Sequence, residues 1–256
     1  MSNKKETFGG TLVFVFIICL VCAALVSIAA VGLKPLQKAN KLLDQHTKIL
    51  EAAGLLEKAG KDIDDTYAKY IEAKFIDLAS GAYTEGNHEI FDERTDARNV
   101  EKSIKPKDDL AGISRRANKA AIYLVKNDQG KVTSVVLPIV GSGLWDLMYG
   151  FIGLEADLNT VKSVVYSDLK ETPGLGAEVL NPKWKALWAG KKMYDEQHQI
   201  AIKIVKGGAK KGDIHGVDAL SGATLTSRGV ERTIHFWLGD EGYGPFITKN
   251  RNGGLN

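Results

Sequence analysis

The strongest pattern in the chain is a run of uncharged, mostly apolar residues near its beginning. The 23 residues from Thr11 to Leu33 include no charged side chain. At 1.5 Å per residue, a helix of this length crosses a hydrocarbon core of about 30 Å. The run therefore predicts one transmembrane helix at residues 11–33. A cleaved signal peptide is the alternative, because Lys4 and Lys5 precede the run and small residues occur at 27–30, but the run continues past them without a polar break.

Apolar residues at helical spacing continue after this run. Leucines and isoleucines recur through residues 36–56, and apolar and aromatic residues recur from Ile63 to Leu78. Both stretches predict helices. Residues 81–118 are polar and weakly patterned, which is typical of loops. We interpret residues 34–118 as a helical and irregular region that packs on the domain that follows.

Strand patterns begin at residue 120. Residues 120–125 and 132–140 are rich in β-branched residues and are separated by the turn Asn127–Gly130, so they predict a hairpin. Further strands are expected around 161–167 and 200–205. Helices are expected around 182–189 and from Ser227 onward, where apolar residues such as Val230 and Ile234 fall on one face. Strands with interspersed helices predict an α+β fold for residues 119–256.

Composition and charge narrow the classes of function. With 44% hydrophobic and 25% charged residues, the chain is globular rather than disordered. A net charge of +3, evenly spread, argues against nucleic-acid binding. The histidines are scattered without metal-ligand spacing, so no metal site is expected. Both cysteines, Cys19 and Cys22, lie within the apolar run, so no disulfide indicates the compartment of the domain.

Candidate chemistry concentrates in the stretch Asp218–Ser227, just before a predicted helix. Hydroxyl residues at 221, 224, 226 and 227 surround Gly222. A helix N-terminus offers free amides and a partial positive charge, and glycine permits close approach of an anion. The stretch therefore predicts a phosphate site. The same residues also suit an ordinary N-cap after a turn.

A second candidate stretch is Lys170–Gly176. Pro173 and Gly174 fit the central positions of a type II turn, and Gly174 and Gly176 expose backbone amides on either side of Leu175. Amides beside an aliphatic side chain suit the polar edge and the face of a flavin ring. A third stretch, Gly141–Trp145, places Trp145 ahead of this turn. It suits a flavin border and a core tryptophan equally well.

Three motifs together resemble the covalent FMN-binding domain. They are Asp-x-x-Ser-Gly-Ala-Thr ending at Thr224, Glu-Thr-Pro-Gly-Leu-Gly beginning at Glu171, and Gly-x-Gly-x-Trp ending at Trp145. The resemblance implies FMN joined through its phosphate to Thr224 by a separate flavin transferase. Thr226, only two residues away, is a rival acceptor. The cofactor-binding residues that it implies are Thr224, Asp218, Ser221, Gly222, Ala223, Leu225, Thr226, Glu171, Thr172, Gly174, Leu175, Gly176 and Trp145.

Over its whole length the chain resembles the C subunits of bacterial Na+-translocating NADH:quinone reductases. The tail from Phe236 to Asn256 distinguishes it from the Rnf-type G subunits, which share the anchor and the two flavin motifs that contain Thr224 and Glu171. The resemblance implies an electron-carrying subunit that works with other subunits to oxidise NADH, reduce ubiquinone and translocate Na+. The chain has no Gly-x-Gly-x-x-Gly between a strand and a helix, so it is not expected to bind NADH itself. The alternatives are an Rnf-type G subunit and a membrane-anchored, non-enzymatic binding or scaffold protein.

The distribution of lysines and the family resemblance predict opposite sides of the membrane for the domain. Lysines at positions 34, 38, 41 and 48 follow the apolar run, while Lys4 and Lys5 precede it, so a simple positive-inside count favours a cytoplasmic domain. The resemblance implies the opposite: a bacterial inner-membrane protein with a short cytoplasmic N-terminus at 1–10 and a periplasmic domain. We adopt the second interpretation, because long domains translocate largely regardless of such charges.

Overall fold

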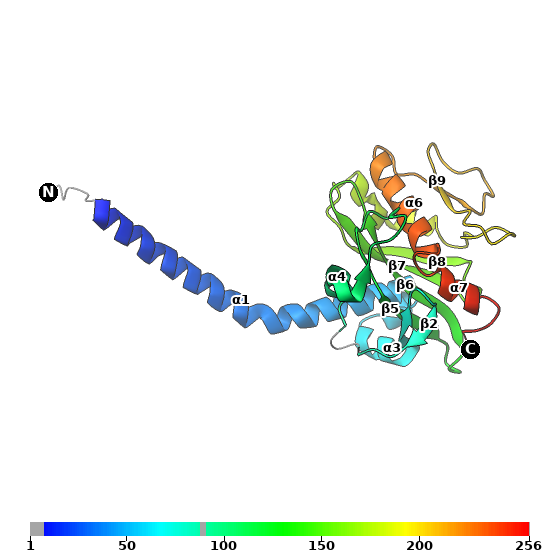
Figure 1. Ribbon diagram of the computed structural model, residues 1–256, viewed down its shortest axis with the longest axis horizontal. Helices are drawn as coiled ribbons and strands as arrows, with labels where there is room; N and C mark the ends of the chain where they lie inside the picture. The colour runs from blue at the N-terminus through cyan, green and yellow to red at the C-terminus, as the bar shows by residue number, and fades with distance from the viewer. Residues whose placement is uncertain (1–7, 88–90, 256) are drawn as a thin grey trace. The chain divides into compact units, whose positions relative to one another are not determined.

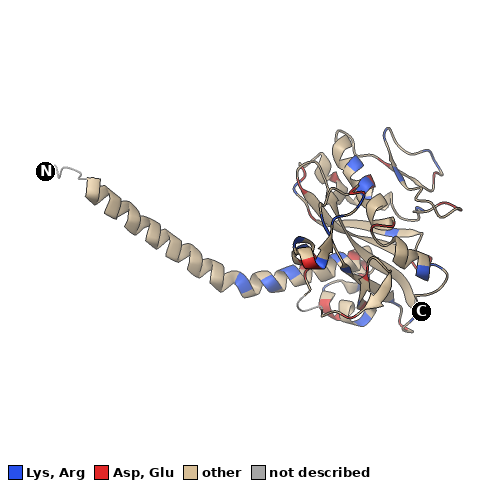
Figure 2. Cartoon of the chain, viewed as in Figure 1, with Lys and Arg blue, Asp and Glu red and all other residues tan. Residues whose placement is uncertain are grey.

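The computed structural model describes residues 8–87 and 91–255, which form two compact units, Met1–Asp44 and Gln45–Asn256. Most of the predicted N-terminal segment 1–10, His88 and Asn256 lie outside the described residues. The first unit contains most of helix α1 (Phe8–Ala52), which has Pro35 within it. In Figure 2 the described N-terminal part of α1 has no segment coloured as Lys, Arg, Asp or Glu. Among the described residues, α1 alone is long and apolar enough to cross a membrane, a test that a signal sequence also passes.

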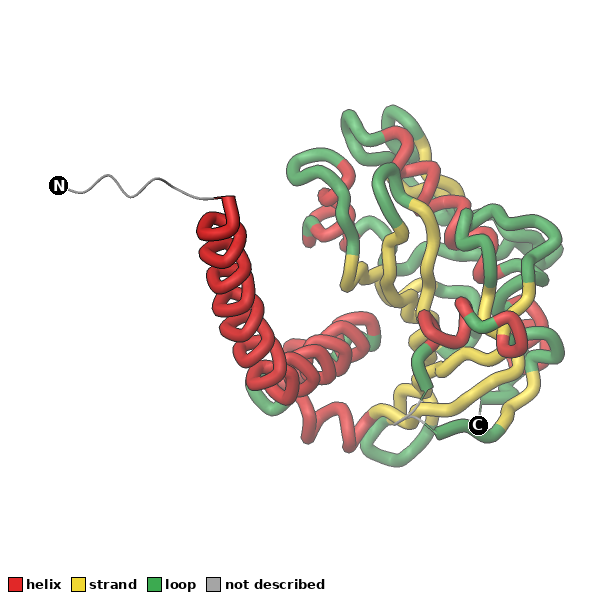
Figure 3. The backbone as a smooth tube through the Cα atoms, turned by 60° about the vertical axis from the view of Figure 1, so that its left-hand side comes forward, coloured by secondary structure: helices red, strands yellow, loops and turns green. Residues whose placement is uncertain are grey.

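The second unit is built on one antiparallel sheet with the order β2-β1-β5-β6-β7-β8 (Figures 1 and 3). The strands are β1 (Ile71–Asp77), β2 (Ala82–Thr84), β5 (Lys119–Lys126), β6 (Val132–Ser142), β7 (Leu147–Glu155) and β8 (Val161–Asp168). Two small sheets pair β3 (Ser103–Ile104) with β4 (Arg116–Ala117), and β9 (Lys203–Val205) with β10 (Gly216–Asp218).

Helices join these strands. They are α2 (Leu56–Ala59), α3 (Ile63–Tyr70), α4 (Glu93–Arg98), α5 (Pro182–Ala186), α6 (Thr224–Leu238) and α7 (Gly244–Asn250), with 3-10 turns η1 (Val100–Lys102) and η2 (Gly176–Leu180). The mixture confirms the predicted α+β class. The hairpin at 120–140 is also confirmed, since β5 and β6 pair directly.

The sheet is buried on both faces, and alternate residues of β5 show this clearly. Ile122 and Leu124 join a core cluster that includes Val230 and Trp237 of α6. Tyr123 and Val125 join a second cluster that includes Leu50 at the end of α1. The period of two in a strand thus directs successive side chains into two separate cores. Helix α6 covers the first face, and it carries the candidate motif at its N-terminus.

Close contacts fix α6 against β6. A Cβ on Gly229 would collide with the carbonyl oxygen of Ser142, so the helix backbone lies against the strand. Trp237 Nε1 donates a hydrogen bond of 2.7 Å to the Val140 carbonyl, and both residues lie in or beside the core. These contacts hold α6 against β6 at its middle and near its C-terminal end.

Several predicted elements differ from the structure. The helical prediction for residues 71–78 is wrong: Ile71–Asp77 form β1, which pairs with β5 and contributes Ile76 to one core and Phe75 to the other. The sheet therefore includes residues well before the predicted domain boundary at 119. The strand expected at 200–205 is limited to β9, and α6 begins at Thr224 rather than near Ser227. The pattern also gave no indication of β7.

Candidate functional site

The N-terminus of α6 is open to an anion. Thr224 is its first residue and is exposed, and the N-cap position is held by Ala223, whose side chain makes no capping hydrogen bond. The first amides of an α-helix have no intrahelical acceptor, and their dipoles add a partial positive charge. Gly222 precedes them at φ +72°, a left-handed conformation that glycine adopts without strain. This end of the helix therefore offers amides and the Thr224 hydroxyl to a phosphate.

Only part of the predicted hydroxyl cluster faces this opening. Ser221 and Thr224 are exposed, whereas Thr226 and Ser227 are 1% and 3% exposed. Ser227 Oγ accepts a hydrogen bond of 3.0 Å from the Leu220 amide, which closes the loop before the helix. Thr226 Oγ1 donates to the Glu171 carboxylate at 2.5 Å. These two hydroxyls stabilise the loop and do not reach solvent.

The predicted Pro173–Gly174 turn lies against the threonine motif. Gly174 has φ +76°, and the amides of Leu175 and Ala177 both donate to the Thr172 carbonyl at 3.1 Å. A Cβ on Gly222 would lie 3.0 Å from Leu175 Cδ2, so the Leu175 side chain sits over the glycine that precedes α6. Leu175 remains 43% exposed. The fold thus brings together two motifs that are about 50 residues apart in the sequence.

Glu171 connects three segments of the site. It is 6% exposed, and its Oε1 accepts hydrogen bonds from the Leu144 and Trp145 amides at 2.8 and 3.1 Å. Its Oε2 accepts the hydrogen bond from Thr226. Glu171 and Thr226 were predicted to bind the cofactor, but in this structure both side chains are buried and satisfied by protein groups. Their geometry is that of groups that hold the site together.

Trp145 is exposed and lies at the border of the same surface. Its side chain is 69% exposed, and its indole Nε1 donates to Thr172 Oγ1 at 3.2 Å. The alternative of a core tryptophan is therefore wrong. Nearby, the pKa of Asp146 is lowered, mainly because Lys170 donates a hydrogen bond to its carboxylate. Leu144 and Leu225 are also exposed, at 48% and 57%.

The strand before the motif fixes Asp218 at the edge of the site. Asp218 Oδ1 accepts a 2.7 Å hydrogen bond from the Ala209 amide, and its carbonyl accepts one of 2.9 Å from Trp184 Nε1. Asp218 is half-buried and ends β10. These hydrogen bonds fix the start of the loop that runs from Asp218 to Thr224, the first residue of α6.

Sequence reasoning missed one residue that the site requires. A Cβ on Gly143 would collide with Glu171 Oε1, so only glycine leaves room for the carboxylate at this point. Gly143 is the second glycine of the Gly-x-Gly-x-Trp pattern. The sequence did not show why a glycine is needed there, because Glu171, the residue that it makes room for, lies 28 positions later in the chain. Gly176 is constrained in the same way by Glu171 Oε2 and Thr226 Oγ1.

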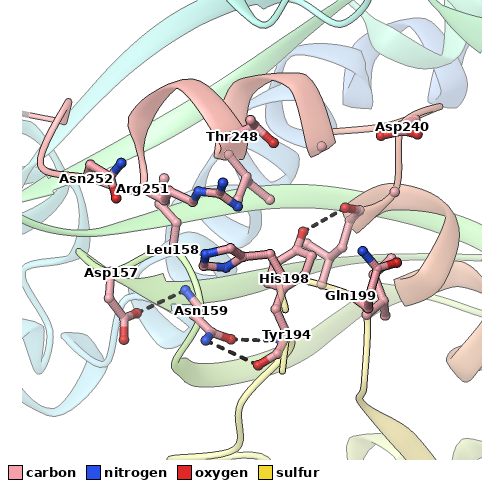
Figure 4. Close-up of a pocket in the computed structure, with 15 residues that line it drawn as sticks. Asp157, Leu158, Asn159, Tyr194, His198, Gln199, Asp240, Thr248, Arg251 and Asn252 are labelled. Carbon is pink, nitrogen blue, oxygen red and sulfur yellow. Dashed lines mark hydrogen bonds between the residues drawn. The ribbon is translucent and has the colours of Figure 1, made fainter. Parts of the chain in front are cut away.

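A cavity of about 360 Å³ lies elsewhere, at the other end of α6 (Figure 4). Leu238, roughly 20 Å along the helix from Thr224, lines it together with Tyr194, His198 and Arg251. The Tyr194 hydroxyl donates to the Leu238 carbonyl at 2.6 Å and so closes the helix end. None of the predicted site residues lines this cavity.

Comparison with known proteins identifies a family for this chain. Residues 143–239 match the family model of the FMN-binding domain, a range that contains every predicted site residue. The chain is 51% identical to the C subunit of the Na+-translocating NADH-quinone reductase of Vibrio alginolyticus over the full length of both chains. It is 43% identical to the corresponding C subunit of Neisseria meningitidis, with 99% of each chain covered.

Solved structures agree with these relatives. The crystal structure of Shewanella oneidensis NqrC is similar with a TM-score of 0.80 at 43% identity, covering 84% of this chain and 99% of that one. The C subunit of the Na+-translocating NADH-quinone reductase from Parabacteroides distasonis is similar with a TM-score of 0.67 at 27% identity, covering 84% and 97%. The fold of the domain is therefore shared with both.

Proposed function

The chain belongs to the family of C subunits of the Na+-translocating NADH-quinone reductases, and we propose that it carries FMN joined covalently through its phosphate to Thr224 Oγ1. Its relatives are named as subunits of that enzyme, so this chain is one subunit of such a complex and not a complete enzyme. FMN supplies reversible one- and two-electron chemistry when bound. The other subunits of the complex are its partners.

One observation supports the proposal: of the neighbouring threonines Thr224 and Thr226, Thr224 is exposed and Thr226 is buried. Thr226 is 1% exposed and its hydroxyl is engaged by Glu171. An unactivated threonine is a poor nucleophile, so attachment needs a flavin transferase with access to the hydroxyl. In the folded domain, Thr224 offers that access and Thr226 does not. The difference favours Thr224 as the acceptor.

The surrounding residues suit the two ends of FMN. Amides of the first turn of α6 and the Ser221 hydroxyl would bind the phosphate, and Gly222 adopts without strain the left-handed conformation that leads into this turn. Leu175 would cover one face of the ring, while Trp145 and the Thr172 hydroxyl lie at its border. The exposed apolar area of these side chains fits a planar aromatic group.

We assign the protein the role of an electron carrier within the complex. The complex would oxidise NADH, reduce ubiquinone and translocate Na+, and this chain would pass electrons between centres that other subunits hold. The relatives that cover the whole chain, its tail included, are named as C subunits, which favours this role over that of an Rnf-type G subunit. The match to the FMN-binding domain favours it over a scaffold without a cofactor.

Helix α1 would anchor the chain in the bacterial inner membrane, with the domain in the periplasm. The apolar part of α1 supports the anchor. The periplasmic orientation rests on the resemblance to the family rather than on the lysines that follow the span.

The experiment is to express the full chain with a flavin transferase and to test for covalent flavin by in-gel fluorescence after denaturation. Thr224→Val keeps the shape of the side chain but removes the hydroxyl, and it should abolish the signal while the protein folds. Thr248→Val removes an exposed threonine hydroxyl from α7 and is the matched control. A flavin peptide containing residue 226 in the Thr224→Val protein, detected by mass spectrometry, would disprove the assignment.

A further inference from the structure

Glu171 is a buried carboxylate at the centre of the candidate flavin site. Among residues 8–87 and 91–255, its hydrogen-bond partners are three neutral donors: the Leu144 and Trp145 amides and the Thr226 hydroxyl. A carboxylate removed from water is stabilised only when such donors replace its hydration. Three donors aimed at one 6% exposed group indicate that this position is built to hold a negative charge.

The backbone around Glu171 is shaped to admit the carboxylate. A side chain at Gly143 or at Gly176 would collide with one or the other of its oxygens. The two glycines belong to different segments, and each segment approaches the carboxylate from its own side. An apolar residue at position 171 would leave the two amides and the hydroxyl without their acceptor, which costs more than the hydrogen bonds contribute when made.

The charge also lies beside the first turn of α6. Thr226, which donates to Glu171 Oε2, is the third residue of the helix, and Thr224 is the first. A negative charge at a helix N-terminus is stabilised by the helix dipole. The same charge opposes the arrival of a second negative charge nearby, because Coulomb repulsion is strong where water is excluded.

We propose that Glu171 is a positioning residue that clamps the three flavin-site segments together, and that its fixed negative charge makes the bound flavin harder to reduce. This inference rests on the proposed function, because the charge acts on a flavin attached at Thr224. The clamp itself acts in the protein with or without the cofactor. The two parts can therefore be measured separately.

Two substitutions separate shape from charge. Glu171→Gln retains an oxygen acceptor for the two amides and an amide group within reach of Thr226, but it removes the charge. Glu171→Ala removes both. Glu178→Gln is the matched control, because Glu178 lies in the same region, is half-buried, and accepts a 2.6 Å hydrogen bond from Asn181 outside the clamp.

The clamp is tested in protein made without the transferase, by hydrogen exchange of the Leu144 and Trp145 amides. We expect roughly tenfold or faster exchange in Glu171→Ala, since hydrogen bonds to charged groups are among the stronger ones. Exchange in Glu171→Gln and Glu178→Gln should stay near that of the wild type. Unchanged exchange in Glu171→Ala would overturn the clamp.

The charge is tested in flavin-loaded protein by potentiometric titration. Glu171→Gln should carry a full complement of flavin with a midpoint potential more positive than that of the wild type, while Glu178→Gln should titrate as the wild type does. A wild-type potential in Glu171→Gln would overturn the electrostatic role. If the wild type itself holds no covalent flavin, the proposed function and the electrostatic role fail together, whereas the exchange result still decides the clamp.

Discussion

Leu175 provides the sharpest test of how the protein surface contacts the ring. Its side chain sits over Gly222, with Cδ2 3.0 Å from the position of a Cβ on that glycine, and 43% of it remains exposed. If the ring covers this remainder, the contact is worth about 0.6 to 1.3 kcal/mol, since full burial of a leucine is worth about 1.5 to 3 kcal/mol. Replacing Leu175 by Ala should remove most of this contribution.

Covalent attachment should survive the change, because Thr224 and the start of α6 do not depend on the Leu175 side chain. The covalently attached flavin is in equilibrium between a state docked on the protein surface and an undocked state. The lost contact should raise the ratio of undocked to docked flavin about three- to ninefold. The flavin content should stay constant, whereas the absorbance spectrum, the accessibility of the flavin to iodide quenching and the midpoint potential should all change.

A matched control lies five residues away. Leu180 is 42% exposed and ends η2, so Leu180→Ala removes the same atoms at nearly the same exposure. It should leave quenching and potential as in the wild type. If Leu175→Ala and Leu180→Ala behave alike, Leu175 does not contact the ring and the turn serves only the fold.

Three further outcomes are expected. Gly222→Ala, at φ +72°, should destabilise the domain by about 1 to 2 kcal/mol in urea unfolding. The loss should exceed that of Gly174→Ala, which has similar strain at φ +76° but whose added Cβ would meet no atom of the described residues within 4 Å; equal losses would contradict the Leu175 contact. Burial opposes ionisation of Asp157, but hydrogen bonds led by those from Thr160 outweigh it and lower the pKa from 3.8 to about 2. The ionised Asp157 therefore stabilises the folded state above about pH 4, and this contribution is lost as the pH falls toward 2. Asp157→Asn should have a lower free energy of unfolding than the wild type at neutral pH, and the difference should shrink between about pH 4 and pH 2. Protease added to intact spheroplasts should degrade the chain beyond Asn40, and full protection would indicate a cytoplasmic domain.

The sequence alone predicted the elements whose patterns are local. A long uncharged run needs no tertiary contact to be recognised as a span, and the hairpin at 120–140 combines β-branched runs with a turn whose residues favour it. The three flavin motifs were also visible, because glycine and proline mark backbone conformations that other residues resist, as Gly174 and Gly222 do at positive φ.

Tertiary context decided the rest. Residues 71–77 have spacing compatible with a helix, but pairing with β5 places Phe75 and Ile76 in two different cores, so they form a strand. The motif favoured Thr224 but left Thr226 as a rival acceptor, and only the fold shows that Thr224 is exposed while Thr226 is buried. The role of Glu171 emerged only from folding, because its partners lie 26, 27 and 55 positions away and meet it only when the sheet and α6 pack together. Local preference follows from neighbouring residues, whereas the surroundings of a buried charge are set by segments that the sequence keeps far apart.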